Sequence, residues 1–314
     1  PDWRPGTDPS KQVIETYTKN TPDIHMFNRW LREVANEFED KVLIGEINLP
    51  FSQLVKHYGD LANGRTEFHL PFNFHLIFAD WTAETVRNLV ESYEGALPSG
   101  AWPNWVLGNH DQHRVASRVG EAQARVAMVL LLTLRGTPTM YYGDEIGMVD
   151  GIIPPERVQD PWEILTPGIG LGRDPERTPM QWDDSQHAGF CPPDVTPWLP
   201  VNENRTAVNV TSQQANPNSM LRLTHRLIQL RQENPALHLG SYQSITASDG
   251  VLAYLRSHDN QRFLVALNFT DQPIQWSLPY PIKTVVLSTK NNLPETENDV
   301  LQLRPNEGVL FSLQ

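Results

Sequence analysis

Two carboxylates follow short apolar segments at corresponding positions of the sequence. Glu46 ends the segment VLIGE, and Asp111 follows the segment WVLGNH. Such runs are typical of strands that are covered on both faces, as in a parallel sheet. In a parallel β/α barrel all strands end at one face, where active sites are built. Two carboxyl groups in one pocket suit glycosidic bond cleavage, although a strand-end carboxylate can equally be an ordinary cap or ion-pair partner.

The segment NHDQH also offers ligands for a metal ion. His110, Asp111 and His113 lie within four residues of one another. Zinc sites on a single element favour other spacings, such as an i, i+4 histidine pair on a helix, and no further His or Cys cluster in the sequence completes a ligand set. We therefore predict no metal site and no cofactor, with His113 in a structural role.

Alternating helical and strand-like segments would position these residues. Apolar spacings of three and four predict helices, and short apolar runs predict strands. Strands that alternate with helices favour a parallel sheet joined by helices, which we expect to occupy residues 1–236. The predicted helices span 21–40, 82–94 and 121–134, and the predicted strands lie within 41–47, 67–74, 104–109 and 136–145.

The remainder of the chain has two further patterns. Residues 150–217 are rich in Pro and Gly without a sustained period, which indicates a long functional loop. A helix over 219–234 ends at Pro235. Residues 237–314 then switch to a period of two between turn signals, so we expect a small antiparallel β-sandwich there.

Composition and charge exclude several classes of partner. The 314 residues include 25 Lys and Arg against 37 Asp and Glu, a formal net charge of −12, which disfavours nucleic acid. The longest apolar run, residues 126–134, is too short to span a membrane. The single cysteine, Cys191, allows no internal disulfide, and we expect a cytoplasmic location.

Several longer strings resemble the α-amylase family of glycoside hydrolases, in particular its α-glucosidases and oligo-1,6-glucosidases. They are LIGEI, VLGNHD, GTPTMYYGDEIGM and RDPERTPMQWDDSQHAGF, in this order, and the resemblance covers nearly the whole chain. It implies a retaining α-glucosidase that acts on terminal α-linked glucose of maltose-like or short α-glucosides. The four strand units then correspond to strands five to eight, so the expected fold is α/β, the second half of a (β/α)8 TIM barrel followed by the β-sandwich.

The resemblance also implies roles for individual residues. Glu46 matches the general acid/base, and Asp111 matches the carboxylate that stabilises the transition state. His110 and Arg177 match residues that bind sugar hydroxyls at the cleavage subsite, and Phe72 matches an aromatic residue at the substrate entrance. The loop over 150–217 would close the cleft into a pocket for one terminal glucose.

One essential part of the family pattern is absent from the sequence. The family's aspartate nucleophile follows the fourth barrel strand in a GFRxD-like string, which this chain lacks, and Asp2 and Asp8 lie in coil before the first helix. We therefore expect the chain to be inactive alone and to associate with the missing N-terminal half of the barrel or with a second copy. Calcium ligands of the family would also lie upstream.

Three alternatives to an α-glucosidase remain open. The chain can be a non-catalytic fragment with a sugar-binding or assembly role, or part of a transglucosylase or isomerase of the same family. A metal-dependent barrel hydrolase would instead lose activity with a chelator.

Overall fold

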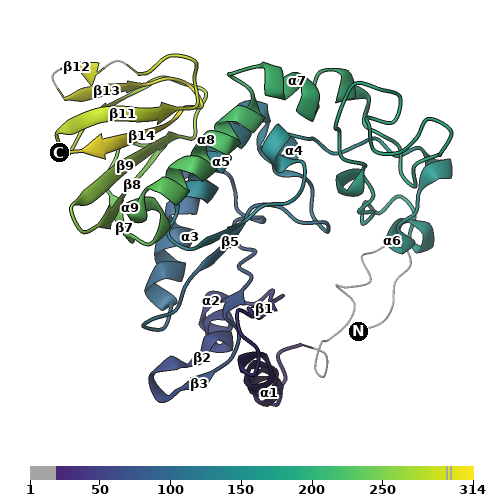
Figure 1. The fold of residues 1–314 in the computed structure, drawn as a ribbon, viewed down its shortest axis with the longest axis horizontal. Coiled ribbons are helices and arrows are strands. Elements are labelled where there is room, and N and C mark those ends of the chain that lie inside the picture. The colour runs from purple at the N-terminus through teal and green to yellow at the C-terminus, as the bar shows by residue number, and fades with distance from the viewer. Residues whose placement is uncertain (1–18, 295, 298) are drawn as a thin grey trace.

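The computed structural model describes residues 19–294, 296–297 and 299–314, so Asp2 and Asp8 lie outside the described residues. A helix-rich α/β part is followed by two antiparallel sheets (Figure 1). In the part of the chain that the structure describes, no helix combines the length and apolar character needed to cross a membrane. The cytoplasmic location stays a prediction.

The predicted helices of the α/β part are present. They are α1 (Ile24–Asn36), α3 (Ala83–Ala96) and α5 (Glu121–Thr133). Helix α3 begins after Thr82, whose side chain accepts a hydrogen bond from the Thr85 N–H (3.1 Å), and it buries Val86 and Val90. Shorter helical elements are α2 (Phe51–Leu54), η2 (Val55–Tyr58), η3 (Leu61–Asn63), α4 (Val115–Val119) and η4 (Asp144–Ile146).

The strands of this part are parallel, as predicted, but shorter than the apolar runs. Strand β1 (Ile44–Gly45) pairs with β4 (Leu70–Pro71), and β5 (Asn104–Val106) pairs with β6 (Thr137–Thr139). Proline has no N–H to donate, so Pro71 in β4 and Pro138 in β6 each remove a ladder hydrogen bond. A small antiparallel hairpin joins β2 (Gly59–Asp60) to β3 (Arg65–Thr66).

Residues 150–217, all of which the structure describes, contain no strand, as the Pro- and Gly-rich composition predicted. Their regular elements are short turns and helices: η5 (Pro155–Arg157), α6 (Pro161–Leu165), η6 (Pro175–Arg177), η7 (Glu203–Thr206) and α7 (Val210–Ala215). In Figure 1 this segment lies at the end of the molecule opposite the C-terminal sheets.

The C-terminal part begins with α8 (Met220–Glu233) and α9 (Pro235–His238), so the expected domain boundary after residue 236 falls within α9. One sheet has the order β11-β14-β9-β8-β7, and a second has the order β10-β13-β12. The strands are β7 (Ser241–Ile245), β8 (Val251–His258), β9 (Gln261–Asn268), β10 (Ile274–Ser277), β11 (Ile282–Ser288), β12 (Thr296–Glu297), β13 (Val300–Leu303) and β14 (Gly308–Leu313).

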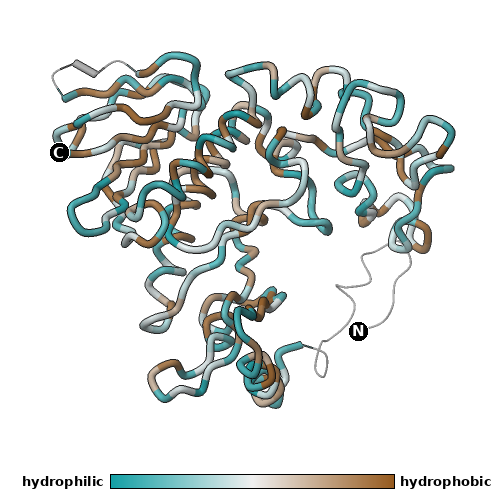
Figure 2. Tube along the Cα trace, in the orientation of Figure 1, coloured by the Kyte–Doolittle hydropathy of each residue, from teal (hydrophilic) through white to brown (hydrophobic). Residues whose placement is uncertain are grey.

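The five-stranded sheet is covered on both faces. Along β8, Val251 and Ala253 contribute to the core between the two sheets, whereas Leu252 and Tyr254 join the core formed with α5 and α8. Figure 2 shows the apolar residues concentrated along these helices and strands. Helix α5 is buried around most of its circumference because α8 and the sheet both pack on it.

Buried polar side chains join the sheet to the helices. The Arg256 guanidinium, fully buried, donates hydrogen bonds to the carbonyl oxygens of Thr133 in α5, Gly240 (2.8 Å) and Ser241 (3.1 Å). Burial lowers the pKa of Arg256 to about 9. Burial deprives carbonyl groups of hydrogen bonds to water, and the hydrogen bonds from Arg256 take their place.

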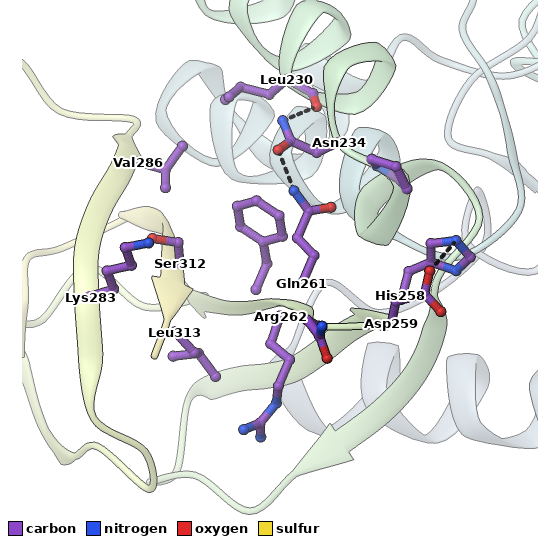
Figure 3. Close-up of a pocket in the computed structure, with 13 residues that line it drawn as sticks. Leu230, Asn234, His258, Asp259, Gln261, Arg262, Lys283, Val286, Ser312 and Leu313 are labelled. Carbon is purple, nitrogen blue, oxygen red and sulfur yellow. Dashed lines mark hydrogen bonds and ion pairs between the residues drawn. The ribbon is translucent and has the colours of Figure 1, made fainter.

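A cavity of about 640 Å³ lies between the end of α8 and the sheet (Figure 3). In it the Gln261 side chain donates a hydrogen bond to the Asn234 side chain (2.7 Å) and accepts one from the Ala236 N–H (2.9 Å). The Asn234 amide donates in turn to the Leu230 carbonyl (2.7 Å). These amides tie β9 to the helix end.

A second buried polar group lies beyond β6. Asp144 in η4 is only 2% exposed, and its Oδ1 has no hydrogen-bond partner. The Arg114 guanidinium lies nearby, 5.0 Å from the ring centre of Tyr141, and it donates to the Tyr142 carbonyl (2.6 Å). Burial nevertheless dominates and raises the pKa of Asp144 to about 7.

We expect Arg256→Met to lower the free energy of unfolding by about 3 kcal/mol or more, because it leaves the carbonyl groups of the buried residues Thr133 and Gly240 without the Arg256 donor. Arg262→Met is the matched control, since Arg262 is only partly buried against the Tyr280 ring (4.8 Å) and its loss costs about 1 kcal/mol or less. Urea unfolding measures both values. Equal losses would contradict the role of Arg256.

The raised pKa of Asp144 predicts a specific pH dependence. Between about pH 4 and pH 7 the unfolded chain has released this proton while the folded chain retains it. Unfolding therefore releases a proton, and the free energy of unfolding falls as the pH rises through this window. In Asp144→Asn the fall is smaller, whereas Asp184→Asn, at an exposed position, leaves it unchanged. Urea titrations at several pH values test this, and identical slopes in both variants would refute it.

Candidate active site

Asp111 lies in the turn that follows the carboxyl end of β5. The Asp111 N–H donates a hydrogen bond to the side chain of Asn109 (3.0 Å). Two guanidinium groups bind the same carboxylate oxygen: Arg177 Nη2 lies 2.7 Å and Arg173 Nη1 2.9 Å from Asp111 Oδ1. Arg177 Nε also donates to the His110 carbonyl (2.7 Å). The structure thus brings together three of the predicted site residues: His110, Asp111 and Arg177.

Arg173 was not singled out from the sequence, and its position depends on Asp160. Arg173 Nε lies 2.8 Å from Asp160 Oδ2, and Arg173 Nη2 lies 3.0 Å from Asp160 Oδ1, a bidentate pair. Asp160 also accepts from the Trp162 N–H at the start of α6 (3.2 Å). The hydrogen bonds from Arg173 hold the pKa of Asp160 well below its usual range. In the sequence, only its place in the charged string RDPER, next to Arg177, could have indicated a role for Arg173.

The second carboxylate oxygen of Asp111 remains accessible. The Asp111 side chain is 30% exposed, and Oδ2 lies 3.6 Å from Nε2 of the exposed His110 ring. Asp111 and Arg173 line a cavity of about 320 Å³. This oxygen can therefore accept hydrogen bonds from a ligand while Oδ1 stays fixed by the two arginines.

An aromatic cavity lies beside this group. It has a volume of about 620 Å³, and His110 and Arg177 line it. The exposed rings of Trp182, Trp198 and Phe190 contribute to its wall. Aromatic faces of this kind suit the apolar faces of sugar rings. The cavity can therefore hold a polyhydroxylated ligand between aromatic faces and charged groups.

Glu46 and Phe72 lie together on the other pair of strands. The Phe72 N–H donates to the carbonyl of Gly45, the residue before Glu46 (2.8 Å). The Phe72 ring contacts Phe74, with 5.6 Å between ring centres, and packs in a small cluster with Val106 of β5. The Glu46 side chain is exposed and has no hydrogen bond or ion pair with any residue that the structure describes. No hydrogen bond or ion pair within that range joins Glu46 to Asp111.

Comparison with known proteins identifies the family to which the chain is similar. Residues 3–240 match the family model "Alpha amylase, catalytic domain", and residues 242–308 match "Maltogenic Amylase, C-terminal domain". An alpha-glucosidase of Apis mellifera is 33% identical over 97% of this chain and 54% of its own length. An oligo-1,6-glucosidase of Parageobacillus thermoglucosidasius is 29% identical over 100% of this chain and 62% of its own length.

Solved structures give the same result. The trehalulose synthase MutB from Pseudomonas mesoacidophila MX-45 superimposes with a TM-score of 0.83 at 28% identity, over 98% of this chain and 62% of that protein. The isomaltulose synthase from Klebsiella sp. LX3 superimposes with a TM-score of 0.83 at 27% identity, over 93% of this chain and 59% of that protein. The chain therefore spans little more than half the length of the relatives it matches. The match of the catalytic-domain model to most of its residues shows that this chain belongs to the α-amylase family.

Proposed function

We propose that this chain is the C-terminal portion of a retaining α-glucosidase that releases terminal α-linked glucose from maltose-like or short α-glucosides. The observation that carries the proposal is the pair of ion pairs that Arg173 and Arg177 form with Asp111. Asp111 lies beside His110 after a strand end, next to an aromatic cavity. The relatives named alpha-glucosidase and oligo-1,6-glucosidase support the substrate class.

In this proposal Asp111 stabilises the transition state. Its Oδ2, together with His110 and Arg177, would bind hydroxyl groups of the sugar at the cleavage subsite. Hydrogen bonds that strengthen as the ring flattens lower the barrier, whereas equal binding of substrate and transition state does not. The two arginines fix Oδ1, so the carboxylate meets the sugar with little rearrangement.

Glu46 would act as the general acid/base. It follows β1 directly, its side chain is exposed, and it forms no ion pair with a described residue. Phe72, which is hydrogen-bonded through its backbone to the residue before Glu46, would line the substrate entrance. The loop over 150–217 supplies Arg177 and the aromatic wall, which supports a pocket for one terminal glucose.

We further infer that the α/β part is the second half of a (β/α)8 barrel, strands five to eight. Helix α1 exposes Phe27, Trp30, Leu31 and Val34 on one apolar stripe, and Phe38 is exposed just beyond the end of the helix. Exposed apolar area of this kind marks an interaction surface. Within the described residues β1 pairs with β4 alone, so its other edge is open to a further strand. The missing N-terminal half of the barrel would cover both and would supply the aspartate nucleophile.

The chain alone is expected to lack hydrolysis, because retaining chemistry needs two carboxyl groups about 5–5.5 Å apart, one of them the nucleophile. We expect the 314 residues to release glucose from an aryl α-glucoside at least about 10³-fold more slowly than a protein that also carries the upstream half. Steady-state kinetics on both proteins measure this. A comparable rate for the chain alone would disprove the assignment of the nucleophile to the missing half.

In the longer protein, Glu46→Gln should reduce maltose hydrolysis by about 10²- to 10⁴-fold. The same variant should leave the rate of the first step, glucose transfer to the enzyme, unchanged for aryl glucosides whose leaving groups need no proton. Asp111→Asn should impair both substrates, because it acts on the sugar at the cleavage subsite. Glu156→Gln, at an exposed position in η5, is the control and should impair neither. Pre-steady-state kinetics separate these cases, and equal losses for both substrates in Glu46→Gln would argue against an acid role.

The structural neighbours favour one second candidate, glucosyl transfer within the same family. They are named as trehalulose and isomaltulose synthases, and the same Asp111 group would serve a transferase. Product analysis with sucrose distinguishes the two functions, since hydrolysis yields free glucose and fructose whereas isomerisation yields a new disaccharide. A protein with the upstream half that performs neither reaction would instead be a non-catalytic sugar-binding or assembly protein.

A further inference from the structure

A second cluster of charged side chains lies behind the Asp111 turn. His113, Asp150 and Glu176 each offer one ligand atom, and these three atoms lie within 4.8 Å of one another. They come from the turn after β5, the first residues of the long loop and η6. This spacing along the chain is why the sequence pattern of His110 and His113 indicated no complete ligand set.

Glu176 is the least accessible member of the cluster. Glu176 is only 2% exposed, and its Oε2 atom has no hydrogen-bond partner. A buried carboxylate oxygen without a donor or cation is unfavourable, because it has lost its water without replacement. A bound cation would remove the penalty.

The other two ligands are already held in place. Asp150 Oδ1 accepts a hydrogen bond from the Arg114 N–H (2.8 Å), and the Asp150 N–H donates to the Ser117 hydroxyl (2.7 Å). Asp150 Oδ2 points to His113, whose Nδ1 lies 2.8 Å away. The His113 side chain is 62% exposed, so an ion can enter from solvent and keep water ligands.

The chemistry of the donor set fits a transition-metal dication. One imidazole nitrogen and two carboxylates supply a charge of −2 when the histidine is neutral. Zn²⁺ combines these ligand types, and sites with three protein ligands retain a water molecule. No arginine forms an ion pair with the carboxylates of Asp150 or Glu176 within the described residues, since Arg173 and Arg177 bind Asp111 and Arg118 donates to the His113 carbonyl (3.0 Å).

We propose that His113, Asp150 and Glu176 form a binding site for a divalent transition-metal cation such as Zn²⁺. The ion would connect both ends of the segment from Asp150 to Glu176 to the turn that carries Asp111. The three ligands are different residues from the proposed sugar-binding group, although His113 and Glu176 line the same cavity as Asp111. The test of the site does not depend on glycosidase activity.

A second histidine-containing cluster is less suited to a cation. His25, His57 and Glu67 also place three ligand atoms within 4.8 Å. However, the Glu67 carboxylate already receives hydrogen bonds from His25 (2.9 Å), Asn28 (3.0 Å) and the Arg29 guanidinium (3.3 Å). Glu67 thus has a direct ion pair with Arg29, whereas no ion pair with an arginine or lysine is found for Glu176 within the described residues.

Isothermal titration of the full chain with ZnCl₂ near pH 7.5, without phosphate, tests the proposal. We expect one equivalent of Zn²⁺ to bind, with affinity reduced at least about tenfold in His113→Ala, Asp150→Asn and Glu176→Gln. Mg²⁺ should not compete, since it prefers oxygen ligands in octahedral geometry. His225→Ala, at an exposed position of α8, and His25→Ala are the controls and should bind Zn²⁺ as the parent chain does.

Two further measurements keep the result unambiguous. Thermal unfolding with and without ZnCl₂ should show stabilisation of the parent chain and of His225→Ala but not of Glu176→Gln. His113 is exposed, so His113→Ala tests the ligand set without disturbing a buried position. Absence of Zn²⁺ binding by the parent chain, or undiminished binding by His113→Ala, overturns the proposal. X-ray absorption that shows a sulfur ligand would do the same, because it would place the ion at Cys191.

Discussion

The shared interaction of two arginines with one oxygen of Asp111 fixes the candidate site. Arg173 and Arg177 follow Asp111 by about sixty residues and belong to a segment with no strand to hold it in place. Arg173 is bound in turn by Asp160, whose side chain also receives the first free N–H of α6. The site geometry therefore depends on a chain of charge-assisted hydrogen bonds that runs from the strand end into the loop.

This polar chain is anchored on one well-buried part of the molecule. Strand β5 is buried throughout, and α5 lies between it and the five-stranded sheet. Arg256 and Arg231 donate hydrogen bonds to carbonyl groups at the end of α5 and in the turn that follows. The N-terminal elements of the α/β part are different, because α1 and β1 leave apolar side chains exposed. Asp111 consequently follows a strand that is fully buried within this chain. Glu46 instead lies where the proposed upstream half would cover exposed apolar side chains.

Local pattern predicted a large part of this structure. Helical spacing indicated α3, α5 and α8, and the period-two segments indicated most strands of the C-terminal sheets. The strand lengths were overestimated because an apolar run does not report on backbone pairing, which Pro71 and Pro138 limit. The NHD and ERTP strings placed Asp111 beside Arg177 only through family resemblance. Arg173, Asp160 and the partners of His113 had no periodic signal, since their contacts join distant segments of an irregular loop.

The short turn η6 connects the two sites that the sequence treated separately. Arg177 and Glu176 are adjacent, and successive side chains of a 3₁₀ turn point about 120° apart. Arg177 therefore reaches the Asp111 carboxylate while Glu176 reaches His113 and Asp150 on another side of the turn. Because both contacts end on residues 111–113, one turn of the loop binds the strand end from two directions. A displacement of η6 would consequently alter the arginine grip and the His113 cluster together, so the position of Asp111 and the occupancy of the proposed metal site are physically coupled.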